Sequence, residues 1–462
     1  MSFVETSFLV FLSVVFCLYH MGSFSLRVQN FLIFISSLYF YAWWDWRFLG
    51  LILATITAGY VAGMLLEKDY HRKLVLITSI TFLLSILAYF KYANFFLESL
   101  ESIVNALGFR FSLASWKIIL PVGISFYTFQ VISYLVDVDR KLVSAERSFI
   151  TFGAFVCFFP QLVAGPIERA SHLLAQFNQK RQLDEQKVRQ AIFLIILGYF
   201  FKVGIADVVA PSVDAAFIVQ QPSGWWTLLG TYGFAIQIYG DFLGYSLIAK
   251  GVALLFGIEL IWNFNFPYWS TSIVEFWRRW HVSLSNWLRD YLYFSLGGSR
   301  SSLSATIRNL LITMVLGGLW HGASWAFVIW GLLHGVALAI NHLQRAYSVP
   351  WIGNKVSGWL ATCLIVYAGW FLFRVRSMEQ ARDMILALGN LEWYPAHTGV
   401  AITLATLSLV IWGIEYMQIR SDDRYWLINC NRFLSVILLS FIVTYTWIMH
   451  GFSETKFIYF QF

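Results

Sequence analysis

Two histidines are the residues of this chain best suited to acid–base chemistry, and they lie in segments of different character. His321 lies in the apolar run from Gly317 to Trp325, and His281 ends a basic and aromatic stretch that begins at Phe276. A charged side chain at the centre of a bilayer costs about 2.5–3.5 kcal/mol, so an ionisable residue in such a run usually faces a cavity or a site. His321 is therefore the first candidate functional residue. The alternative is a buried histidine that is hydrogen-bonded to a neighbouring carbonyl.

The surroundings of His321 favour a neutral imidazole that accepts a proton. Residues 309–340 contain no formal charge, and a helix of that length would extend about 48 Å, well beyond a hydrocarbon core of ~30 Å. We therefore predict a break at Gly317-Gly318, which places His321 near the start of the next helix, where the helix dipole disfavours imidazolium. Small residues leave room for a substrate there, namely Gly317, Gly318, Gly322 and Ala323. His334 falls on nearly the opposite helix face and is not an expected partner.

The stretch from Glu275 to Gly297 has the pattern of an amphipathic helix. At about 100° per residue, one face is polar and comprises Glu275, Arg278, Arg279, Ser285, Asn286, Arg289 and Asp290. The other face is apolar and aromatic, and His281 lies on the boundary. One interpretation is an interfacial helix anchored by tryptophans and basic residues. The other is a helix that lines the mouth of a site, with arginines placed for a phosphate-bearing ligand. The two interpretations are compatible.

The composition is that of an integral membrane protein. Of the 462 residues, 59% are hydrophobic and 12% are charged, whereas a soluble globular protein has about 25% charged residues. The apolar runs are continuous rather than alternating, so the backbone must satisfy its own hydrogen bonds as helix. We predict an all-α polytopic membrane protein with about ten to twelve transmembrane helices. The net charge of +7 fits basic cytoplasmic loops and does not indicate nucleic-acid binding.

The chain is expected to form one membrane-embedded domain. No charged segment between the apolar blocks is long enough to fold separately, so the prediction is a single domain over residues 1–462 with its core at residues 121–340. Phe155–Pro166 is too short to cross a bilayer and ends in prolines, which predicts a re-entrant segment. Pro121-Val122-Gly123 interrupts the start of another segment. Broken helices at membrane depth are tolerated where they line a cavity, so the middle of the chain is expected to surround an internal space.

Motifs for several other classes of site are missing from the sequence. There is no His-Glu-x-x-His, no paired-cysteine motif, no phosphate-binding glycine loop and no Gly-x-Ser-x-Gly, so a metal site, an ATPase and a serine hydrolase are not expected. The four cysteines are scattered and are interpreted as buried small apolar residues. Four charged residues in or near apolar blocks are expected at helix ends or in buried pairs, with ion ligands of a transporter as the alternative: Lys202, Asp207, Asp241 and Lys250.

Several motifs resemble the membrane-bound O-acyltransferase (MBOAT) family, in particular its bacterial branch of polysaccharide O-acetyltransferases, which includes alginate O-acetylases. The strongest matches are Phe276–Ser285, Trp287–Tyr293, Gly317–Gly322 and Pro160–Ile167. Further matches are Tyr39–Trp43, Phe90–Phe95 and Pro121–Tyr127. One departure is Asp241–Leu247, where Leu243 and Leu247 stand at positions that are often polar in relatives. This departure leaves the acyl group or the acceptor open.

The resemblance implies a ring of transmembrane helices, with re-entrant segments, around a central funnel in which a cytoplasmic acyl donor meets an extracytoplasmic acceptor. His321 takes the position of the family's essential histidine and is expected to be the general base. His281 takes the position of the second active-site histidine and is expected to orient the donor or polarise its thioester carbonyl. Residues expected to bind the donor are Arg278, Arg279, Asn286 and Arg289.

The resulting hypothesis is an O-acetyltransferase of the bacterial inner membrane that has no tightly bound cofactor and uses acetyl-CoA as donor. The acceptor is an exported polysaccharide, such as alginate, cellulose or peptidoglycan, and an extracytoplasmic partner protein is expected to take part in the transfer. Two alternatives from other classes are a proton-coupled transporter or flippase of an acyl carrier or glycan lipid, and a non-catalytic scaffold. Internal inverted repeats and paired intramembrane acids would indicate a transporter, and the sequence has neither.

Overall fold

A computed structural model of the chain describes residues 1–21, 25–109, 112, 118–163, 165–219, 223–300, 302–348, 354–450 and 457–458. Within these residues the secondary structure is helical and there is no β-strand, which confirms the predicted all-α class. The chain forms two compact units, each built from separate segments. Unit 1 consists of Met1–Asp184, Ala253–Ile261 and Gly322–Ser324, and unit 2 of Glu185–Val252, Trp262–His321 and Trp325–Phe462. The single domain over residues 1–462 stays a prediction.

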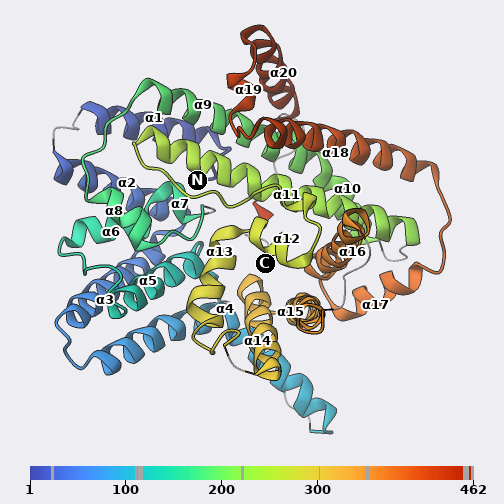
Figure 1. Cartoon of the computed structure of the whole chain (residues 1–462), viewed down its shortest axis with the longest axis horizontal. Coiled ribbons are helices and arrows are strands. Elements are labelled where there is room, and N and C mark those ends of the chain that lie inside the picture. Colours follow the sequence, from blue (N-terminus) through green and yellow to red (C-terminus); the bar gives the residue numbers. More distant parts are fainter. Residues whose placement is uncertain are drawn as a thin grey trace. The chain divides into compact units, whose positions relative to one another are not determined.

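Unit 1 begins with long helices and continues with short ones (Figure 1). Its helices are α1 (Thr6–Met21), α2 (Leu26–Asp45), α3 (Leu49–Glu67), α4 (Arg72–Ala106), α5 (Ile124–Asp139), α6 (Phe149–Cys157), α7 (Phe159–Leu162) and α8 (Ala175–Phe177). A 3-10 turn, η1 (Trp46–Phe48), joins α2 to α3, and a π-helical turn, η2 (Ala170–Leu174), precedes α8. Helices α2, α3 and α5 all pack against α6.

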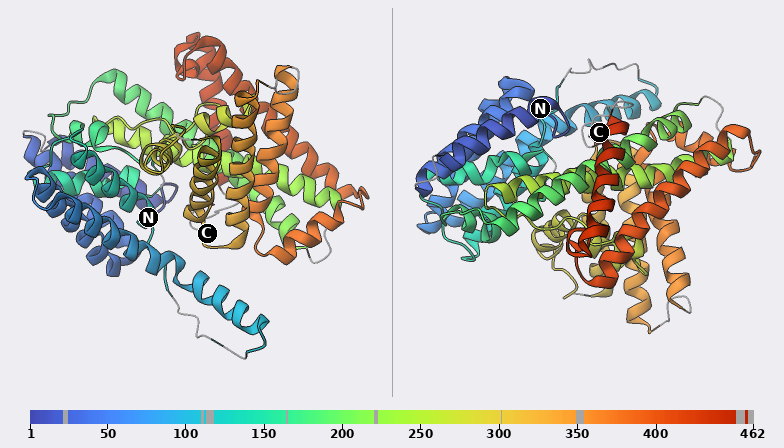
Figure 2. Two further views of the ribbon diagram at one scale, coloured as in Figure 1. Left: turned by 60° about the horizontal axis from the view of Figure 1, so that its bottom comes forward. Right: turned by 90° about the horizontal axis from the view of Figure 1, so that it is seen from above.

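Unit 2 contains the remaining helices, except that residues 253–255 at the end of α11 belong to unit 1. They are α9 (Glu185–Tyr199), η3 (Phe200–Ala206), α10 (Asp207–Ile218), α11 (Gly224–Leu255), η4 (Pro267–Trp269), α12 (Ile273–Arg279), α13 (Val282–Trp287), η5 (Leu288–Tyr293), α14 (Leu303–His321), α15 (Trp325–Ala346), α16 (Lys355–Arg374), α17 (Met378–Ala387), α18 (Pro395–Ser421), α19 (Trp426–Asn429) and α20 (Arg432–His450). Helix α15 packs against both α14 and α16, and the three run side by side (Figure 2). The short helix α12 packs against α15 and α16.

Nine helical segments of the described chain are long and apolar enough to cross a membrane. One of them, Leu26–Glu67, consists of α2 and α3 joined by η1, and Thr6–Met21 and Phe149–Leu162 are shorter apolar helices. In hydrocarbon every backbone N–H and C=O must be bonded inside the protein, and helices satisfy this condition within each segment. The chain is therefore a polytopic membrane protein, as predicted.

Both predicted interruptions of unit 1 are present. Phe158 separates α6 from α7 in a non-helical conformation, with φ −48° and ψ 108°. Gly123 precedes α5 with φ 73°, a left-handed conformation that glycine adopts without strain. A Cβ atom at Gly123 would lie 2.5 Å from the carbonyl oxygen of Leu162, so the two interruptions lie against each other. Ala164, in the same predicted segment, lies outside the described residues.

The break predicted at Gly317-Gly318 is wrong. Helix α14 is continuous through both glycines and ends at His321. Because α14 ends at His321, its 19 residues extend only about 28 Å at ~1.5 Å per residue, so the helix needs no break to fit a bilayer. The chain turns at residues 322–324 instead, and α15 begins at Trp325.

The glycines of α14 and α15 serve helix packing rather than substrate access. A Cβ atom at Gly318 would lie 2.1 Å from the carbonyl oxygen of Phe327, and one at Gly331 would lie 2.3 Å from the carbonyl oxygen of Met314. Small residues let two helix backbones approach closely, which is a common basis of helix association in membranes. The space predicted for a substrate beside Gly318 is therefore filled by α15.

Buried charges in unit 2 form pairs, as predicted. The Nζ atom of Lys202 lies 2.7 Å from Oδ1 of Asp207 and 2.8 Å from Oδ1 of Asp241. All three side chains are buried. Nζ of Lys250 lies 4.9 Å from the ring centroid of Trp262, a cation–π contact. Lys202 therefore bridges both aspartates, and the charge of Lys250 lies against an aromatic ring.

We expect Gly318→Ala to destabilise the protein, because the added Cβ would overlap backbone atoms of α15 that cannot rotate away. Overpacking of this kind costs about 1–3 kcal/mol. Thermal unfolding of the purified protein in detergent measures the effect. Gly413→Ala in α18 is the matched control, because nothing lies within 4 Å of a Cβ at Gly413. Equal melting temperatures for the two variants would contradict the close packing of α14 on α15.

Candidate active site

His321 lies in the interior of unit 2 among aromatic rings. It is the last residue of α14 and is 5% exposed. The ring centroids of Trp320, Trp330 and Phe373 each lie 5.1 Å from the centroid of its imidazole. Because His321 lies at the C-terminal end of a helix, the argument that an N-terminal dipole keeps it neutral is wrong.

His281 lies beside His321. It is fully buried, and the two imidazole centroids are 6.4 Å apart. Trp320 contacts both rings, with its centroid 5.8 Å from that of His281. Phe242 of α11 packs edge-on against His281 at 4.7 Å. The two residues predicted to be catalytic are therefore neighbours within one unit, in an apolar and aromatic environment.

The amphipathic helix predicted over Glu275–Gly297 is interrupted, and His281 lies at the interruption. Helix α12 ends at Arg279, Trp280 is extended (φ −97°, ψ 130°), and His281 has φ 42° before α13 begins. Trp280 is 1% exposed. A continuous helix would have placed Trp280 on the same face as Trp277, and burial of the indole takes precedence over helix continuation. The break turns His281 inward from the boundary position that the helical pattern predicted.

A loop before α12 holds the backbone on both sides of His281. The amide of Val282 donates to the carbonyl oxygen of Asn263 at 2.9 Å, and the amide of Asn265 donates to the carbonyl oxygen of Arg279 at 2.9 Å. Ser283 Oγ donates to Oδ1 of Asn263 at 2.7 Å and lies 3.4 Å from Nδ1 of His281. These bonds hold the left-handed conformation of His281, which otherwise costs an L-residue about 1–2 kcal/mol.

Burial decides the charge of His281. The pKa of its imidazole is lowered to about 3 because the buried ring is removed from water. The ring is therefore neutral at pH 7 and has one donor and one acceptor nitrogen. A neutral imidazole suits hydrogen bonding to a reacting carbonyl or hydroxyl.

The residues predicted to bind the donor are spread over three short elements. They are Arg278 and Arg279 in α12, Asn286 in α13 and Arg289 in η5. Arg279 forms an ion pair with Glu275 at 2.6 Å, and Arg289 forms one with Asp290 at 2.7 Å. Arg278 is exposed and has no ion pair within the described part of the chain. Their role in donor binding stays a prediction, and Arg278 is the best placed of the arginines for an external phosphate.

The two leucines that depart from the family pattern line a small cavity of unit 2. Leu243 and Leu247 of α11 line it together with aromatic residues, and Glu415 and Arg424 contribute the charged groups. Glu415 accepts hydrogen bonds from the hydroxyl of Tyr239 and, at 2.8 Å, from Nε1 of Trp269. The leucines therefore make this cavity more apolar than polar residues at the same positions would.

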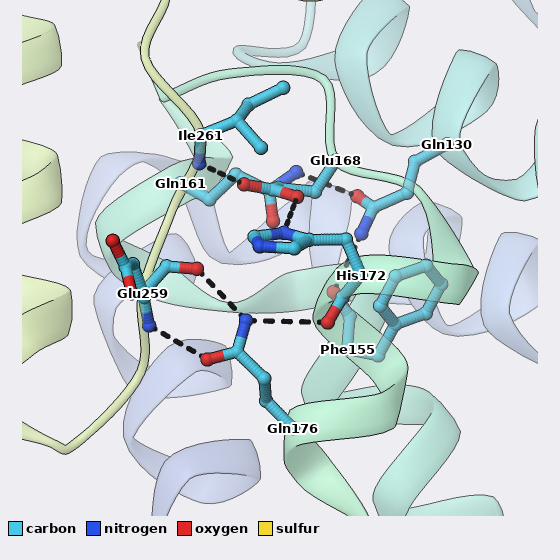
Figure 3. A network of polar contacts seen from close by, with 8 residues as sticks. All are labelled: Gln130, Phe155, Gln161, Glu168, His172, Gln176, Glu259 and Ile261. Atoms are coloured by element: carbon cyan, nitrogen blue, oxygen red, sulfur yellow. Dashed lines mark hydrogen bonds and ion pairs between the residues drawn. The ribbon is translucent and has the colours of Figure 1, made fainter.

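A polar network in unit 1 surrounds Glu168, which directly follows the matching motif Pro160–Ile167 (Figure 3). The carboxylate of Glu168 is fully buried, accepts the amide of Ile261 at 2.7 Å and lies 2.7 Å from Nδ1 of His172. The side chain of Gln176 forms two hydrogen bonds with the backbone of Glu259, at 2.8 and 2.9 Å. The network fastens the segment Ala253–Ile261 to the rest of unit 1.

Residues 38–355 match the family model of the membrane-bound O-acyltransferase (MBOAT) family. The chain belongs to this family. It is 41% identical over 405 residues to the probable alginate O-acetylase AlgI of Azotobacter vinelandii, and this alignment covers 85% of this chain and 80% of that protein. It is 37% identical to the probable alginate O-acetylase AlgI of Pseudomonas putida, with 98% of each chain covered. It is also 34% identical to the peptidoglycan O-acetyltransferase of Helicobacter pylori, over 78% of this chain and 73% of that protein.

The protein is therefore an O-acyltransferase of the membrane, and the enzyme class takes precedence over the transporter and scaffold alternatives. The matched region contains both histidines and all four predicted donor residues. The resemblance seen in the sequence motifs is thus confirmed at the level of the family. The roles of individual residues stay predictions.

Sequence reasoning missed several residues of the site. Asn263 and Ser283 hold the backbone at His281, but nothing in a loop sequence indicates this pairing. Trp330 contacts both His321 and His334: its ring centroid lies 5.1 Å from that of His321 and 4.8 Å from that of His334. The helical angle between His321 and His334 predicts that they lie on opposite faces, but helix α14 ends at His321, so one helical wheel does not describe both residues.

We expect His281→Gly to be more stable than His281→Ala by about 1 kcal/mol, because only glycine adopts a positive φ without strain. Both variants lose the imidazole, so both are expected to lose acyl transfer. Thermal unfolding and an acyl-transfer assay on the same preparations separate the two effects. Higher stability of the alanine variant would argue against the left-handed conformation at His281.

Proposed function

We propose that this O-acyltransferase is an O-acetyltransferase that moves acetyl from cytoplasmic acetyl-CoA across the membrane for the O-acetylation of an exported polysaccharide. The observation that supports the proposal most directly is the pair of buried imidazoles, 6.4 Å apart, inside a helical membrane protein. A reaction between a donor and an acceptor from opposite sides of a bilayer needs a group at membrane depth that can take a proton. His321, at the end of the apolar helix α14, is proposed to be that group.

In the proposed reaction, His321 acts as general base. The acceptor oxygen forms a bond to the thioester carbonyl carbon while its proton passes to His321, and the carbonyl electron pair moves onto oxygen. When the carbon–sulfur bond breaks, the carbonyl re-forms and the departing thiolate takes the proton from His321. General base catalysis of this kind contributes typically about 10²–10⁴-fold. Neutral His281 donates a hydrogen bond to the thioester carbonyl or orients it.

The acceptor is proposed to be a polysaccharide because relatives named as alginate O-acetylases and a peptidoglycan O-acetyltransferase match most of this chain. Alginate is the first polymer to test, and peptidoglycan and cellulose are the alternatives. The apolar Leu243 and Leu247 are proposed to bear on the acyl group, because they line a cavity together with Phe264, whose ring contacts Phe242 beside His281. Acetyl is proposed as the acyl group because it is small and because the relatives are named as O-acetylases and an O-acetyltransferase.

Localisation and partnership are part of the proposal. The enzyme is proposed to lie in the bacterial inner membrane, where acetyl-CoA is available on the cytoplasmic side. Its charged segments between apolar blocks are short, so an extracytoplasmic partner protein is proposed to complete the transfer to the polymer. The four polar residues named above as donor ligands are proposed to hold the phosphates of CoA. Arg278 is the first of them to test, because no ion pair engages it among the residues that the structure describes.

We expect His321→Ala to abolish acetyl esters on the exported polymer in a deletion strain that the wild-type gene restores. The reason is loss of the proposed base, and ester content is measured after mild alkaline release of acetate. His342→Ala is the matched control, because this histidine lies on the same pair of helices outside the aromatic cluster. Equal membrane levels of all variants are checked by immunoblot. Full restoration by His321→Ala would rule out the general-base role.

We expect Arg278→Gln to raise the KM for acetyl-CoA about tenfold, because a charge-assisted hydrogen bond to phosphate contributes about 1.5–3 kcal/mol. The assay uses purified enzyme in vesicles with acetyl-CoA on one side and polymer on the other. Arg382→Gln serves as the control, since this arginine is exposed and already paired with Asp383 at 3.0 Å. An unchanged KM would remove Arg278 from the donor site. The same vesicles with and without an extracytoplasmic extract show whether a partner is needed.

A further inference from the structure

Three buried nitrogen atoms next to the histidine pair have no hydrogen-bond partner within the described chain. They are Nε1 of Trp277, Nε1 of Trp330 and Nδ1 of His334. Trp330 and His334 are each 1% exposed. A buried donor or acceptor without a partner costs about 1–3 kcal/mol, and such groups normally pair with protein or ordered water. Three of them in one place indicate a polar occupant.

The three rings lie in mutual contact. The centroid of His334 lies 4.8 Å from that of Trp330 and 5.2 Å from that of Trp277, and the two tryptophans are 5.7 Å apart. They come from two elements of unit 2 that pack together, α12 and α15. The three unpartnered nitrogen atoms therefore belong to one cluster of side chains.

Gly369 of α16 provides the space. A Cβ atom there would lie 2.6 Å from Nε2 of His334 and 3.3 Å from Nε1 of Trp330. Any residue other than glycine would press on the polar edges of both rings. The close approach of α16 at Gly369 therefore confines Nε1 of Trp330 and the Nε2 edge of His334, whose unpartnered nitrogen is Nδ1, and offers no side chain that could bond to them.

The chemistry of the three groups restricts the occupant. An indole N–H can only donate, and neutral imidazole donates from one nitrogen and accepts at the other. Two obligatory donors call for an oxygen with two lone pairs that is not itself a cation. A water molecule or a carbonyl oxygen meets this condition, whereas an ammonium or a metal ion does not.

We propose that Trp277, Trp330 and His334 form a binding site for one oxygen atom that accepts hydrogen bonds, beside the histidine pair. Trp330 also contacts His321, at a centroid distance of 5.1 Å, so the occupant lies one aromatic ring from the general base. The oxygen belongs either to an ordered water that holds these rings in place or to the acyl carbonyl of the donor. In the second case, which rests on the proposed function, the indole donors stabilise the negative charge that develops on that oxygen.

The first test needs no activity. Density maps of the full-length protein in lipid nanodiscs, at a resolution that shows ordered water, are compared with and without a non-hydrolysable acetyl-CoA analogue. A peak within hydrogen-bonding distance of the indole nitrogens in the free protein identifies water. A peak only with the analogue, continuous with its acyl group, identifies the carbonyl. No peak in either map overturns the proposal, whatever the enzyme acetylates.

The second test uses substitutions that keep the aromatic character. Trp330→Phe removes the indole N–H, and Trp370→Phe is the matched control, because Nε1 of Trp370 already donates to the hydroxyl of Tyr268 at 3.1 Å. Removal of a donor to a developing oxyanion lowers kcat about 10²–10³-fold, so that loss with little change in KM is expected of the carbonyl site. If the site holds water, the density peak is expected to be absent in Trp330→Phe, while KM and kcat each change less than tenfold. Equal kinetics and an unchanged peak in both variants would refute the site.

Gly369→Ala offers a variant that keeps all three rings. The added methyl would press on Nε2 of His334 and Nε1 of Trp330 and displace both rings, so we expect the peak to disappear. If Trp330→Phe fails to fold, this variant and the wild-type maps still decide the question. A retained peak in folded Gly369→Ala would contradict the placement of the occupant beside Gly369.

Discussion

The absence of water from the bilayer interior is the constraint on which this structure depends. Each polar group at membrane depth must find its partner inside the protein, because an unpaired one costs several kcal/mol in hydrocarbon. Lys202 meets this condition with two aspartates at 2.7 and 2.8 Å, and Glu415 meets it with a tyrosine and a tryptophan. Three buried ring nitrogens without such a partner in the described chain, in Trp277, Trp330 and His334, belong to rings in mutual contact next to the histidine pair.

Aromatic rings build the surroundings of that pair. Around His321 three rings lie at the same centroid distance of 5.1 Å, and Phe242 and Trp320 contact His281. Such rings exclude water without adding charge, and Trp can also donate one hydrogen bond. The low pKa of His281, about 3, follows directly from this burial. An environment of this kind strengthens each remaining electrostatic contact with a substrate.

Close backbone contacts set where the two histidines lie. Gly318 and Gly331 bring α14 and α15 together, and this contact fixes the end of α14 at which His321 stands. On the other side, Asn263 pairs with the chain at Val282 and Ser283 and stabilises a left-handed residue at position 281. Strain of this type persists only where surrounding bonds over-determine the conformation, and it is common at functional sites. The two arrangements meet at an imidazole separation of 6.4 Å.

The amino-acid sequence alone determined the class of the protein and its candidate residues. Continuous apolar runs dictate membrane helices, because a membrane β-strand would alternate apolar and polar residues. The motifs around His281 and His321 indicated the family. The prolines and Gly123 also predicted the broken helices of unit 1. These features are local, so they can be read from neighbouring residues.

Only the tertiary structure decided where helices end and which side chains meet. The break expected at Gly317-Gly318 did not occur, because the glycines are matched to the backbone of α15, which no local pattern reveals. The helix expected through His281 is broken, because burial of Trp280 and pairing with Asn263 outweigh helix propagation. His334 joined the site for the same reason: contacts between helices depend on packing in three dimensions, whereas periodicity along one helix describes only that helix.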